Sequence, residues 1–350
     1  MIPGLLGFGL NVSALLDAFP APLVLAVGLG LLLLGGHWLV QGAVTIARAL
    51  GVSTLMIGLT VVAFGTSSPE LAFNVIAALG GNSDLSFGNV IGSNIANIAL
   101  VLGLAALVSP LPVHSRVITR EIPLLIALAG ALLAAAWLRF PGASAPEHAW
   151  FFGRLEGGVM LAVFAVFVWN WFQAGRREAR DALAPISVEE AEETQVKSKP
   201  LAVLLFLLGL ALLVTGGKCA ENGAVRLAAW AGVSDALIGL TVVALATSLP
   251  EIVTSVVASR KGHGDLAVGN VVGSNMFNVL LILGITASVA PVHIPQGRGG
   301  WDLLFHTGLT VVLFPLAYTG GNTMKRVEGA MLVLAYLGYM AWSVWWELGG

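Results

Sequence analysis

The sequence predicts an all-α integral membrane protein in which ten transmembrane helices form two inverted five-helix repeats. Composition is the first reason: hydrophobic residues make up 57% of the 350 residues and charged residues only 10%, whereas soluble proteins carry about 25% charged residues. The second is that apolar stretches of membrane-spanning length recur along the chain. They do not alternate between polar and apolar residues, as transmembrane β-strands would. The third is an internal repeat, which divides the chain into two halves.

The internal repeat is clearest in the segment Gly58–Glu70, which recurs in the second half as Gly239–Glu251. Both copies keep two threonines, a serine, a proline and a glutamate at the same places. The correspondence covers the first three spans of each half, whereas the fourth and fifth spans show no similarity to their counterparts. A repeat of this kind indicates that the fold is assembled from two related units.

The apolar pattern predicts the spans in order, each long enough to cross a bilayer. The first half, residues 21–174, is predicted to hold spans at 22–47, 53–79, 85–108, 118–138 and 151–174. The second half, residues 201–350, is predicted to hold spans at 200–226, 233–259, 265–289, 301–319 and 327–347.

Two segments fall outside these spans. Residues 175–200 are polar and contain several arginines and a run of glutamates, so we interpret them as a cytoplasmic linker between the halves, although a solvated helix on the same face fits equally well. Residues 1–20 contain no Lys or Arg, unlike the basic start of a secretory signal. We interpret them as a retained, non-cytoplasmic N-terminal extension.

Basic residues indicate the orientation, because cytoplasmic loops are enriched in Lys and Arg. If the 175–200 loop is cytoplasmic, most of the seventeen Lys and Arg residues lie on that side. A multi-pass protein of the cell membrane, plasma or inner, with both termini non-cytoplasmic is therefore expected. Five crossings separate the two similar segments, so they enter the membrane from opposite sides, and the repeat is inverted. Many secondary transporters have this architecture, with sites near the membrane midplane.

The repeated segment carries unusual chemistry for a membrane span. Thr66 follows Ala63 by three residues, Ser67 by four and Glu70 by seven. At this spacing one helix face presents Ala63, Glu70 and either Ser67 or Thr66 together. Pro69 cannot donate a backbone hydrogen bond, which frees carbonyl oxygens near residues 65 and 66, and Pro250 is expected to do the same in the second copy. Exposed carbonyls at membrane depth need protein, water or an ion to satisfy them.

The third span of each half adds a polar stripe at spacing i, i+4 and i+8. Its residues are Asn89, Ser93 and Asn97 in the first half and Asn270, Ser274 and Asn278 in the second. Neither motif contains an imidazole or a thiolate, and an all-oxygen set favours hard cations such as Ca²⁺ over zinc, copper or nickel. Two glutamates also carry enough charge to neutralise one Ca²⁺ or two Na⁺ in a low-dielectric setting.

The two blocks resemble the paired α-repeats of the calcium/cation antiporter superfamily, most closely its sodium/calcium exchanger family and prokaryotic relatives. The resemblance implies four central helices that hold the ions and two long helices, the first and sixth, that slide against them. The pairs Gly35-Gly36 and Gly216-Gly217 would be points of close contact in that movement. It also implies exchange of Na⁺ for Ca²⁺ by alternating access at one paired-glutamate site.

The resemblance implies that Glu70 and Glu251 are the central ligands and that the backbone oxygens of Thr66 and Thr247 complete a Ca²⁺ site. It implies two sodium sites, lined by Ser67, Ser93 and the Ala63 carbonyl on one side and by Ser248, Ser274, Thr247 and the Ala244 carbonyl on the other. Asn97 and Asn278 would lie beside the glutamates. Several sodium/calcium exchangers carry Asp at the position of Asn278, so the stoichiometry and the counter-ion stay open.

A purely structural role for these residues is the alternative interpretation. The glutamates could be structural carboxylates paired with Lys218 or Arg226, but neither base explains two symmetric copies. Interhelical hydrogen bonding is a sufficient reason for Asn89 and Asn270, and such a structural role is favoured for the asparagines at 94 and 275.

Other functions remain as alternatives to the sodium-driven antiporter. A Ca²⁺/H⁺ antiporter and a K⁺-dependent Na⁺/Ca²⁺ exchanger of the same superfamily stay open. A cation channel belongs to a different class, and the inverted repeat favours alternating access over a continuous pore. There is no nucleophile–base pair, zinc motif or nucleotide-binding loop in the sequence, so we expect neither an enzyme nor an ATP-driven pump. We expect Ca²⁺ and Na⁺ as substrates and a lipid bilayer around the protein, without cofactor, nucleic acid or obligate protein partner.

Overall fold

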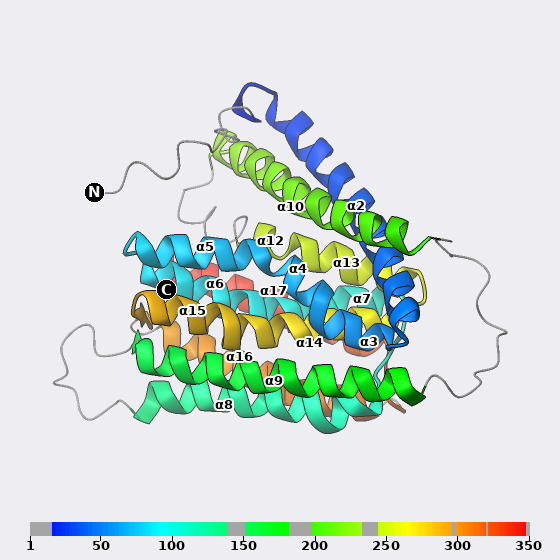
Figure 1. The fold of residues 1–350 in the computed structure, drawn as a ribbon. Helices are drawn as coiled ribbons and strands as arrows, with labels where there is room; N and C mark the ends of the chain where they lie inside the picture. Colours follow the sequence, from blue (N-terminus) through cyan, green and yellow to red (C-terminus); the bar gives the residue numbers. More distant parts are fainter. Residues whose placement is uncertain are drawn as a thin grey trace.

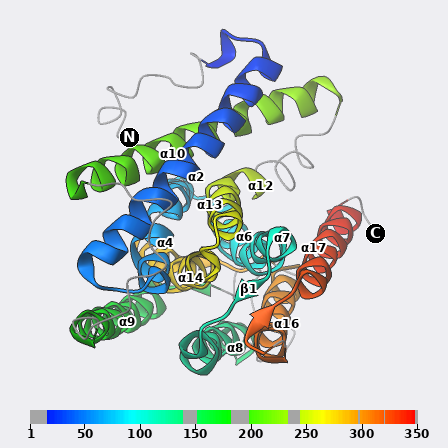
Figure 2. The same cartoon turned by 90° about the vertical axis from the view of Figure 1, so that its right-hand side faces the viewer.

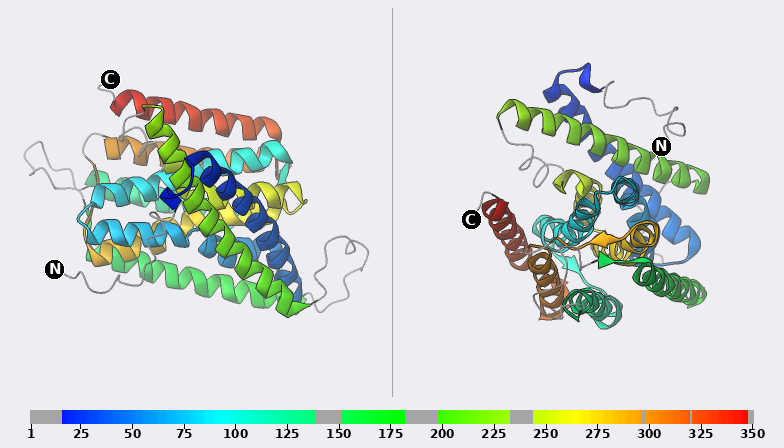
Figure 3. Two further views of the ribbon diagram at one scale, coloured as in Figure 1. Left: turned by 90° about the horizontal axis from the view of Figure 1, so that it is seen from above. Right: turned by 90° about the vertical axis from the view of Figure 1, so that its left-hand side faces the viewer.

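The computed structural model describes residues 16–138, 151–181, 198–232, 244–295, 298–319 and 321–347. In this part of the chain most helices run side by side as a bundle, and two long helices lie obliquely across one side of it (Figure 1). These are α2 (Ala21–Leu50) and α10 (Lys199–Trp230). The view from above shows both crossing the bundle at a slant (Figure 3).

The first half continues after α2 with helices that contain π-helical turns. The second span is built from α3 (Thr54–Ile57), the π-helical segment Gly58–Val62, α4 (Ala63–Thr66) and α5 (Ser68–Leu79). The third is built from α6 (Ser83–Ile95), the π-helical segment Ala96–Val101 and α7 (Leu102–Val108). Then follow β1 (Leu111–Pro112), the π-helical segment Val117–Glu121, α8 (Ile122–Leu138), β2 (Phe151–Phe152) and α9 (Arg154–Asp181).

The second half repeats this order after α10. Its described elements are α12 (Ala244–Thr247), α13 (Leu249–Arg260), α14 (Gly264–Met276), the π-helical segment Phe277–Ile282, α15 (Leu283–Val289), β3 (Val292–His293), α16 (Arg298–Thr319), β4 (Thr323–Met324) and α17 (Arg326–Glu347). From α5 to β1 and from α13 to β3, corresponding elements have equal lengths and follow one another at equal intervals, π-helical turns included. The repeat in sequence is therefore also a repeat in local backbone structure.

The prediction of an all-helical membrane protein is confirmed. The described residues contain eight helices long and apolar enough to cross a membrane, or nine spans if the bent pair Thr54–Thr66 and Ser68–Leu79 counts as one. The predicted span 233–259 lies partly outside the described residues. Most of the extension 1–20 and residues 182–197 of the predicted linker also lie outside them. Helix α9 continues to Asp181, so the linker predicted at 175–200 begins as helix, because arginine, glutamate and alanine favour helices.

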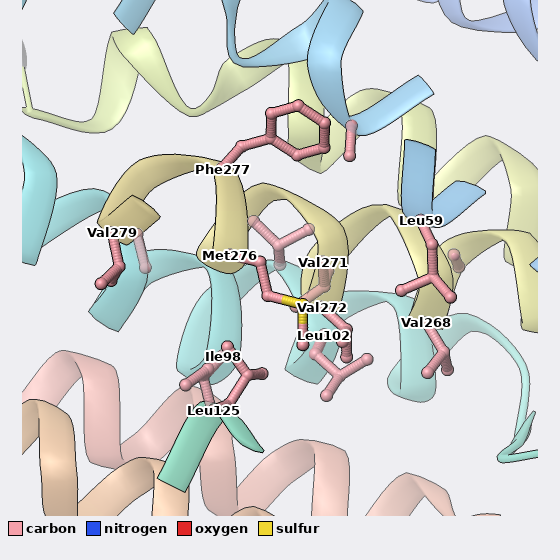
Figure 4. Packing of buried hydrophobic residues seen from close by; sticks show 14 of the residues in the cluster. Leu59, Ile98, Leu102, Leu125, Val268, Val271, Val272, Met276, Phe277 and Val279 are labelled. Atoms are coloured by element: carbon pink, nitrogen blue, oxygen red, sulfur yellow. The ribbon is translucent and has the colours of Figure 1, made fainter. Parts of the chain in front are cut away.

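The most buried spans are the third of each half. In the apolar stretch of Ser83–Val108, 83% of the residues are buried, and in that of Gly264–Val289 the share is 94%. In the other six candidate helices at most 39% of the residues of the apolar stretch are buried. Apolar side chains of the α14 span pack there against residues such as Leu59, Ile98 and Leu102 (Figure 4). The centre of the molecule therefore lies between α6–α7 and α14–α15.

These two central spans run in opposite directions. The chain leaves α7 for β1 and leaves α15 for β3. The Ser83 hydroxyl at the start of α6 lies 2.8 Å from Nδ1 of His293 in β3. In the same way, Pro112 of β1 packs against Gly264 at the start of α14. Each span thus begins where the other ends, and the pairs β1–β4 and β2–β3 close the two ends of the bundle (Figures 2 and 3).

The two long helices are joined by glycines at heptad spacing. A Cβ atom at any of these six positions would come closer than 3.0 Å to the backbone of the other helix: Gly28, Gly35, Gly42, Gly209, Gly216 and Gly223. Spacing of seven keeps them on one helix face, and the small residues let the backbones approach closely. Helices α2 and α10 therefore form one tightly packed antiparallel pair.

The glycine pairs singled out from the sequence divide between two contacts. Gly35 and Gly216 contact the opposite long helix, whereas Gly36 lies against Val253 and Gly217 against Pro250, both on α13. Through the second glycine of each pair, both long helices thus pack against α13, the helix that carries Glu251.

The fourth and fifth spans, which show no similarity in sequence, carry matching polar clusters. Glu121 at the start of the fourth span is fully buried. Its carboxylate lies 3.5 Å from Nε of Arg116 and accepts a hydrogen bond from the indole N–H of Trp171 at 3.4 Å. Asp302 occupies the equivalent place in α16, where it contacts Arg298 at 3.4 Å and accepts a hydrogen bond from the Tyr339 hydroxyl at 2.8 Å.

We expect Glu121→Leu to destabilise the protein by about 1–3 kcal/mol, because it leaves the indole N–H of Trp171 without its acceptor in a buried place. Thermal unfolding of the purified protein measures the effect. Asp84→Asn is the matched control, since Asp84 is exposed at the start of α6. An unchanged unfolding midpoint for Glu121→Leu would show that the cluster contributes nothing to stability.

Candidate cation-binding site

The two glutamates lie directly after the breaks in the second and seventh spans. In the first half the helix ends at Thr66 and resumes at Ser68 with a bend of 43°, as predicted from Pro69. Ser67, at the break, has φ −87° and ψ 4°, and Ser248 has φ −87° and ψ 0°. Glu70 and Glu251 thus stand in the first turn of a new helix, where the helix dipole favours a negative charge.

Both glutamates are buried, with exposed fractions of 2% and 1%. The Ser67 hydroxyl donates a hydrogen bond to Oε1 of Glu251 at 3.0 Å. Serine of the first half therefore contacts the carboxylate of the second, so the two breaks meet at the centre of the molecule.

The carbonyls freed at the first break are partly used within the protein. The Ser68 hydroxyl donates to the Gly65 carbonyl at 2.7 Å, which replaces the hydrogen bond that Pro69 cannot make. The Ala63 carbonyl accepts from the Ser67 amide at 3.0 Å. It also lies 3.4 Å from the Thr66 hydroxyl, whose single proton has a nearer acceptor in Oδ1 of Asn270 at 3.2 Å. The prediction of a freed carbonyl at residue 65 is thus corrected: a local hydroxyl satisfies it.

Among the buried oxygen atoms that lack a hydrogen-bond partner in the described part of the chain, seven belong to the predicted site residues. They are Oε2 of Glu70, Oε2 of Glu251, Oδ1 of Asn97, Oδ1 of Asn278, Oγ of Ser93, Oγ of Ser248 and Oγ of Ser274. Buried polar atoms without a partner are uncommon and costly. Other buried oxygens, such as Oγ1 of Thr286 and Oδ1 of Asn275, also lack a partner, but the seven site atoms are the kind that hard cations bind.

The amide of Asn278 pairs with that of Asn94. Its Nδ2 donates to Oδ1 of Asn94 at 3.0 Å, and its own Oδ1 and Nδ2 of Asn94 are buried without a partner. Asn94, favoured as structural from the sequence, thus forms a hydrogen bond between the two halves.

The threonines before the breaks bond to asparagines. Thr66 contacts Asn270 at 3.2 Å and Thr247 contacts Asn89 at 3.4 Å. Behind these asparagines lie Asn74 and Ser255, which the sequence analysis did not single out. They occupy the same place in the two copies of the repeat, and a polar residue there in both copies was the signal that could have revealed them.

The remaining predicted residues are placed in the same region. Ser274 and Ala63 are fully buried, and Ala244 begins α12, although its side chain lies outside the described residues. The alternative partners for the glutamates are elsewhere. Arg226 bonds to the carbonyl of Leu16 at 3.2 Å, and Lys218 is exposed.

The combined arrangement offers two carboxylates, hydroxyls and amide oxygens in a buried place at the junction of the two halves. Among the described residues no group of three or more His, Cys, Asp and Glu is placed to hold a metal ion. The oxygen set of the proposed site fits hard cations.

Comparison with known proteins gives consistent matches over nearly the whole chain. The family model described as sodium/calcium exchanger protein matches residues 20–173 and 201–345. The putative antiporter CaxA of Alkalimonas amylolytica is 39% identical over 322 residues, which cover 91% of this chain and 97% of that protein. The sodium/calcium exchanger MaX1 of Methanosarcina acetivorans is 32% identical over 343 residues, 91% and 97% of the two chains.

A solved structure shares the fold. The sodium-calcium exchanger NCX_Mj, soaked with Na⁺ and Sr²⁺, superposes with a TM-score of 0.74 at 28% sequence identity. The match covers 92% of this chain and 97% of that one.

Proposed function

The chain belongs to the sodium/calcium exchanger family, and from that premise we propose that it exchanges Na⁺ for Ca²⁺ across the membrane by alternating access at the paired-glutamate site. It is a multi-span membrane protein with the fold of an ion exchanger. The observation that carries the proposal is that the buried carboxylates of Glu70 and Glu251 each keep one oxygen without a hydrogen-bond partner, while Ser67 of the first half bonds to Glu251 of the second.

The proposed architecture has ten spans in two inverted halves, residues 21–174 and 201–350, joined by a cytoplasmic linker. Its support is the opposite direction of the two central spans and the matching lengths and intervals of their elements. The protein would lie in the cell membrane with both termini outside, as its basic residues indicate.

In the proposed site, Glu70 and Glu251 bind the cation from opposite sides. Ca²⁺ takes about 6 to 8 oxygens, more than two carboxylates provide. The further ligands would come from the backbone oxygens of Thr66, Thr247, Ala63 and Ala244, the hydroxyls of Ser67, Ser93, Ser248 and Ser274, and the amide oxygens of Asn97 and Asn278.

Exchange follows from the shared carboxylates. Two uncompensated charges in a buried place are costly, so the glutamates favour being neutralised by one Ca²⁺ or by Na⁺ whenever the site is closed. Because the same oxygens serve both cations, Na⁺ and Ca²⁺ compete. The tightly packed pair α2–α10, which rests on α13 through Gly36 and Gly217, would expose the site to each side in turn.

The counter-ion is proposed to be Na⁺. A proton needs only a carboxylate, whereas Na⁺ is bound by several oxygens, which the unpartnered hydroxyls of Ser93 and Ser248 and the amide oxygen of Asn278 would supply. Asn278 adds no charge, so the two glutamates are the charged residues of the proposed ligand set.

Calcium-45 uptake into proteoliposomes tests the function. Vesicles are loaded with Na⁺, with K⁺ or with a buffer that sets a pH gradient, and uptake is followed in Na⁺-free medium. We expect uptake only from Na⁺-loaded vesicles, reversed by external Na⁺. Uptake driven by the pH gradient alone would replace the proposal with Ca²⁺/H⁺ antiport, a joint requirement for K⁺ and Na⁺ would indicate the K⁺-dependent exchanger, and uptake without any counter-ion gradient would contradict antiport.

A further inference from the structure

Two short hydrogen-bonded arms connect the halves of the molecule beside the glutamates. In the first arm, Nδ2 of Asn89 on α6 donates to the Thr247 hydroxyl on α12 at 3.4 Å. Behind it, Nδ2 of Asn74 on α5 donates to Oδ1 of Asn89 at 2.7 Å. The arm thus runs from the first half to the threonine that precedes the break in the second half.

The second arm is the counterpart of the first in the other copy of the repeat. The Thr66 hydroxyl on α4 donates to Oδ1 of Asn270 on α14 at 3.2 Å. Nδ2 of Asn270 donates to the Ser255 hydroxyl on α13 at 3.0 Å. Thr66, Asn270 and Ser255 are fully buried, so this arm runs from the second half to the first without competition from water.

The asparagines of the arms differ from those of the ion site. Both Asn89 and Asn270 use their amide oxygen and their amide nitrogen within the protein, whereas Asn97 and Asn278 each leave their oxygen without a partner. Asn89 and Asn270 therefore do not need a cation to complete their hydrogen bonding, and they stand one layer behind the proposed ligands.

The orientation of the first arm follows from a backbone group. Nδ2 of Asn74 also donates to the Glu70 carbonyl at 2.7 Å, and a carbonyl can only accept. Asn74 must therefore present its N–H groups, Asn89 must turn its oxygen toward Asn74, and its N–H groups then face Thr247. Ser255 stands in place of Asn74 in the second arm, and its hydroxyl accepts the Asn270 amide instead.

We propose that Asn89 and Asn270 are positioning residues for cation binding, each of which holds the threonine of the opposite half so that its backbone carbonyl stays directed at the glutamates. This inference rests on the proposed function. Each threonine lies at the last turn before a helix break, where its carbonyl orientation is not secured by a continuing helix. Each arm takes over the role of the missing helical hydrogen bond in orienting this carbonyl, and together the arms join the two halves around one ion.

A crossed set of double mutants tests the inference. The bonded pairs are Asn89→Leu with Thr247→Val and Asn270→Leu with Thr66→Val, and the matched controls are the exchanged pairs, Asn89→Leu with Thr66→Val and Asn270→Leu with Thr247→Val. Leucine and valine keep the approximate volume and remove the hydrogen bond, while the threonine carbonyl remains. The readout is equilibrium calcium-45 binding to the purified full chain without Na⁺.

We expect each single substitution to weaken Ca²⁺ binding by about threefold to tenfold, in keeping with the loss of one hydrogen bond between the halves. A bonded double mutant should bind about as well as its weaker single, because both changes remove the same contact, whereas the losses in an exchanged pair should multiply. Thr247→Ser and Thr66→Ser keep the hydroxyl and should therefore weaken Ca²⁺ binding less than the corresponding valine variants.

The outcomes separate this inference from the proposed function. If the parent protein binds no Ca²⁺, the proposed function itself is wrong. If it binds Ca²⁺ but the bonded pairs multiply as the exchanged pairs do, or the single variants bind normally, the arms do not position the threonines. Where a leucine variant does not fold, as thermal unfolding would reveal, Asn89→Ala or Asn270→Ala completes the same cycle.

Discussion

Glu70→Gln and Glu251→Gln are each expected to abolish exchange, with Ca²⁺ uptake reduced by at least about a hundredfold. Glutamine keeps the size and one oxygen of the side chain but removes its charge. A bound Ca²⁺ would then carry an uncompensated positive charge in a buried place, and breaking a buried ion pair in this way costs about 3–5 kcal/mol, where each ~1.4 kcal/mol is tenfold in affinity. Uptake of calcium-45 into Na⁺-loaded proteoliposomes measures the effect.

Because of the repeat, the prediction must hold at two positions and is therefore stricter than a prediction for one substitution. Because the two glutamates lie at equivalent places in the two halves, both variants should fail, and the double variant should be no worse than either. Glu328→Gln is a suitable control, since Glu328 stands in the first turn of α17 and accepts a hydrogen bond from the Lys325 amide at 3.0 Å. Normal transport by either site variant would remove that glutamate from the proposed ligand set.

The second large effect is expected at the contact between the long helices. Gly35→Leu should prevent or strongly weaken the packing of α2 on α10, because a Cβ atom there would lie 2.8 Å from the Gly209 carbonyl oxygen and the Leu213 amide nitrogen. Backbone atoms cannot move aside as a flexible side chain can, so the cost should be at the upper end of the roughly 1–3 kcal/mol typical of overpacking or above it.

Gly30→Leu is the matched control for this substitution. Gly30 lies on the same helix, and a Cβ atom there has no neighbour within 4 Å among the described residues, so leucine would face outward and should leave folding and transport unchanged. The thermal unfolding midpoint and the yield of monodisperse purified protein measure both variants. If Gly35→Leu and Gly30→Leu unfold at the same temperature, the glycine contact does not hold the long helices together.

Much of the fold can be predicted from the sequence because it depends on local composition. Long apolar segments predict the spans, and the described helices follow them within a few residues at most ends. The break before Glu70 follows from Pro69, which removes one hydrogen bond wherever the helix lies. The burial of both glutamates could also be expected, since a carboxylate in an apolar span turns away from lipid.

The proposed ion-site residues were singled out in the same way, because the repeat marks them twice. Glu70, Ser93 and Asn97 recur at 251, 274 and 278 within otherwise apolar segments. Ser93 and Asn97 are four residues apart on one span, which places them on one face. A pattern carried by one helix therefore predicts which of its residues point inward together.

The tertiary structure alone decided which residue meets which across the two halves. No spacing along the chain predicts that Ser67 donates to Glu251, that Asn278 donates to Asn94, or that Asn89 reaches Thr247. Nor does it reveal that Glu121 and Asp302 occupy equivalent clusters in spans without sequence similarity.

The physical reason is that a helix determines its own faces but not its neighbours. Periodicity and proline act within a few residues of the same chain segment, so the sequence by itself determined the spans, the breaks and the inward faces of this protein. Hydrogen bonds between segments from different halves of the chain depend on the order, direction and closeness of the packed helices. That packing is set by small residues such as Gly35 and Gly216, whose partners appear only once the helices are in contact.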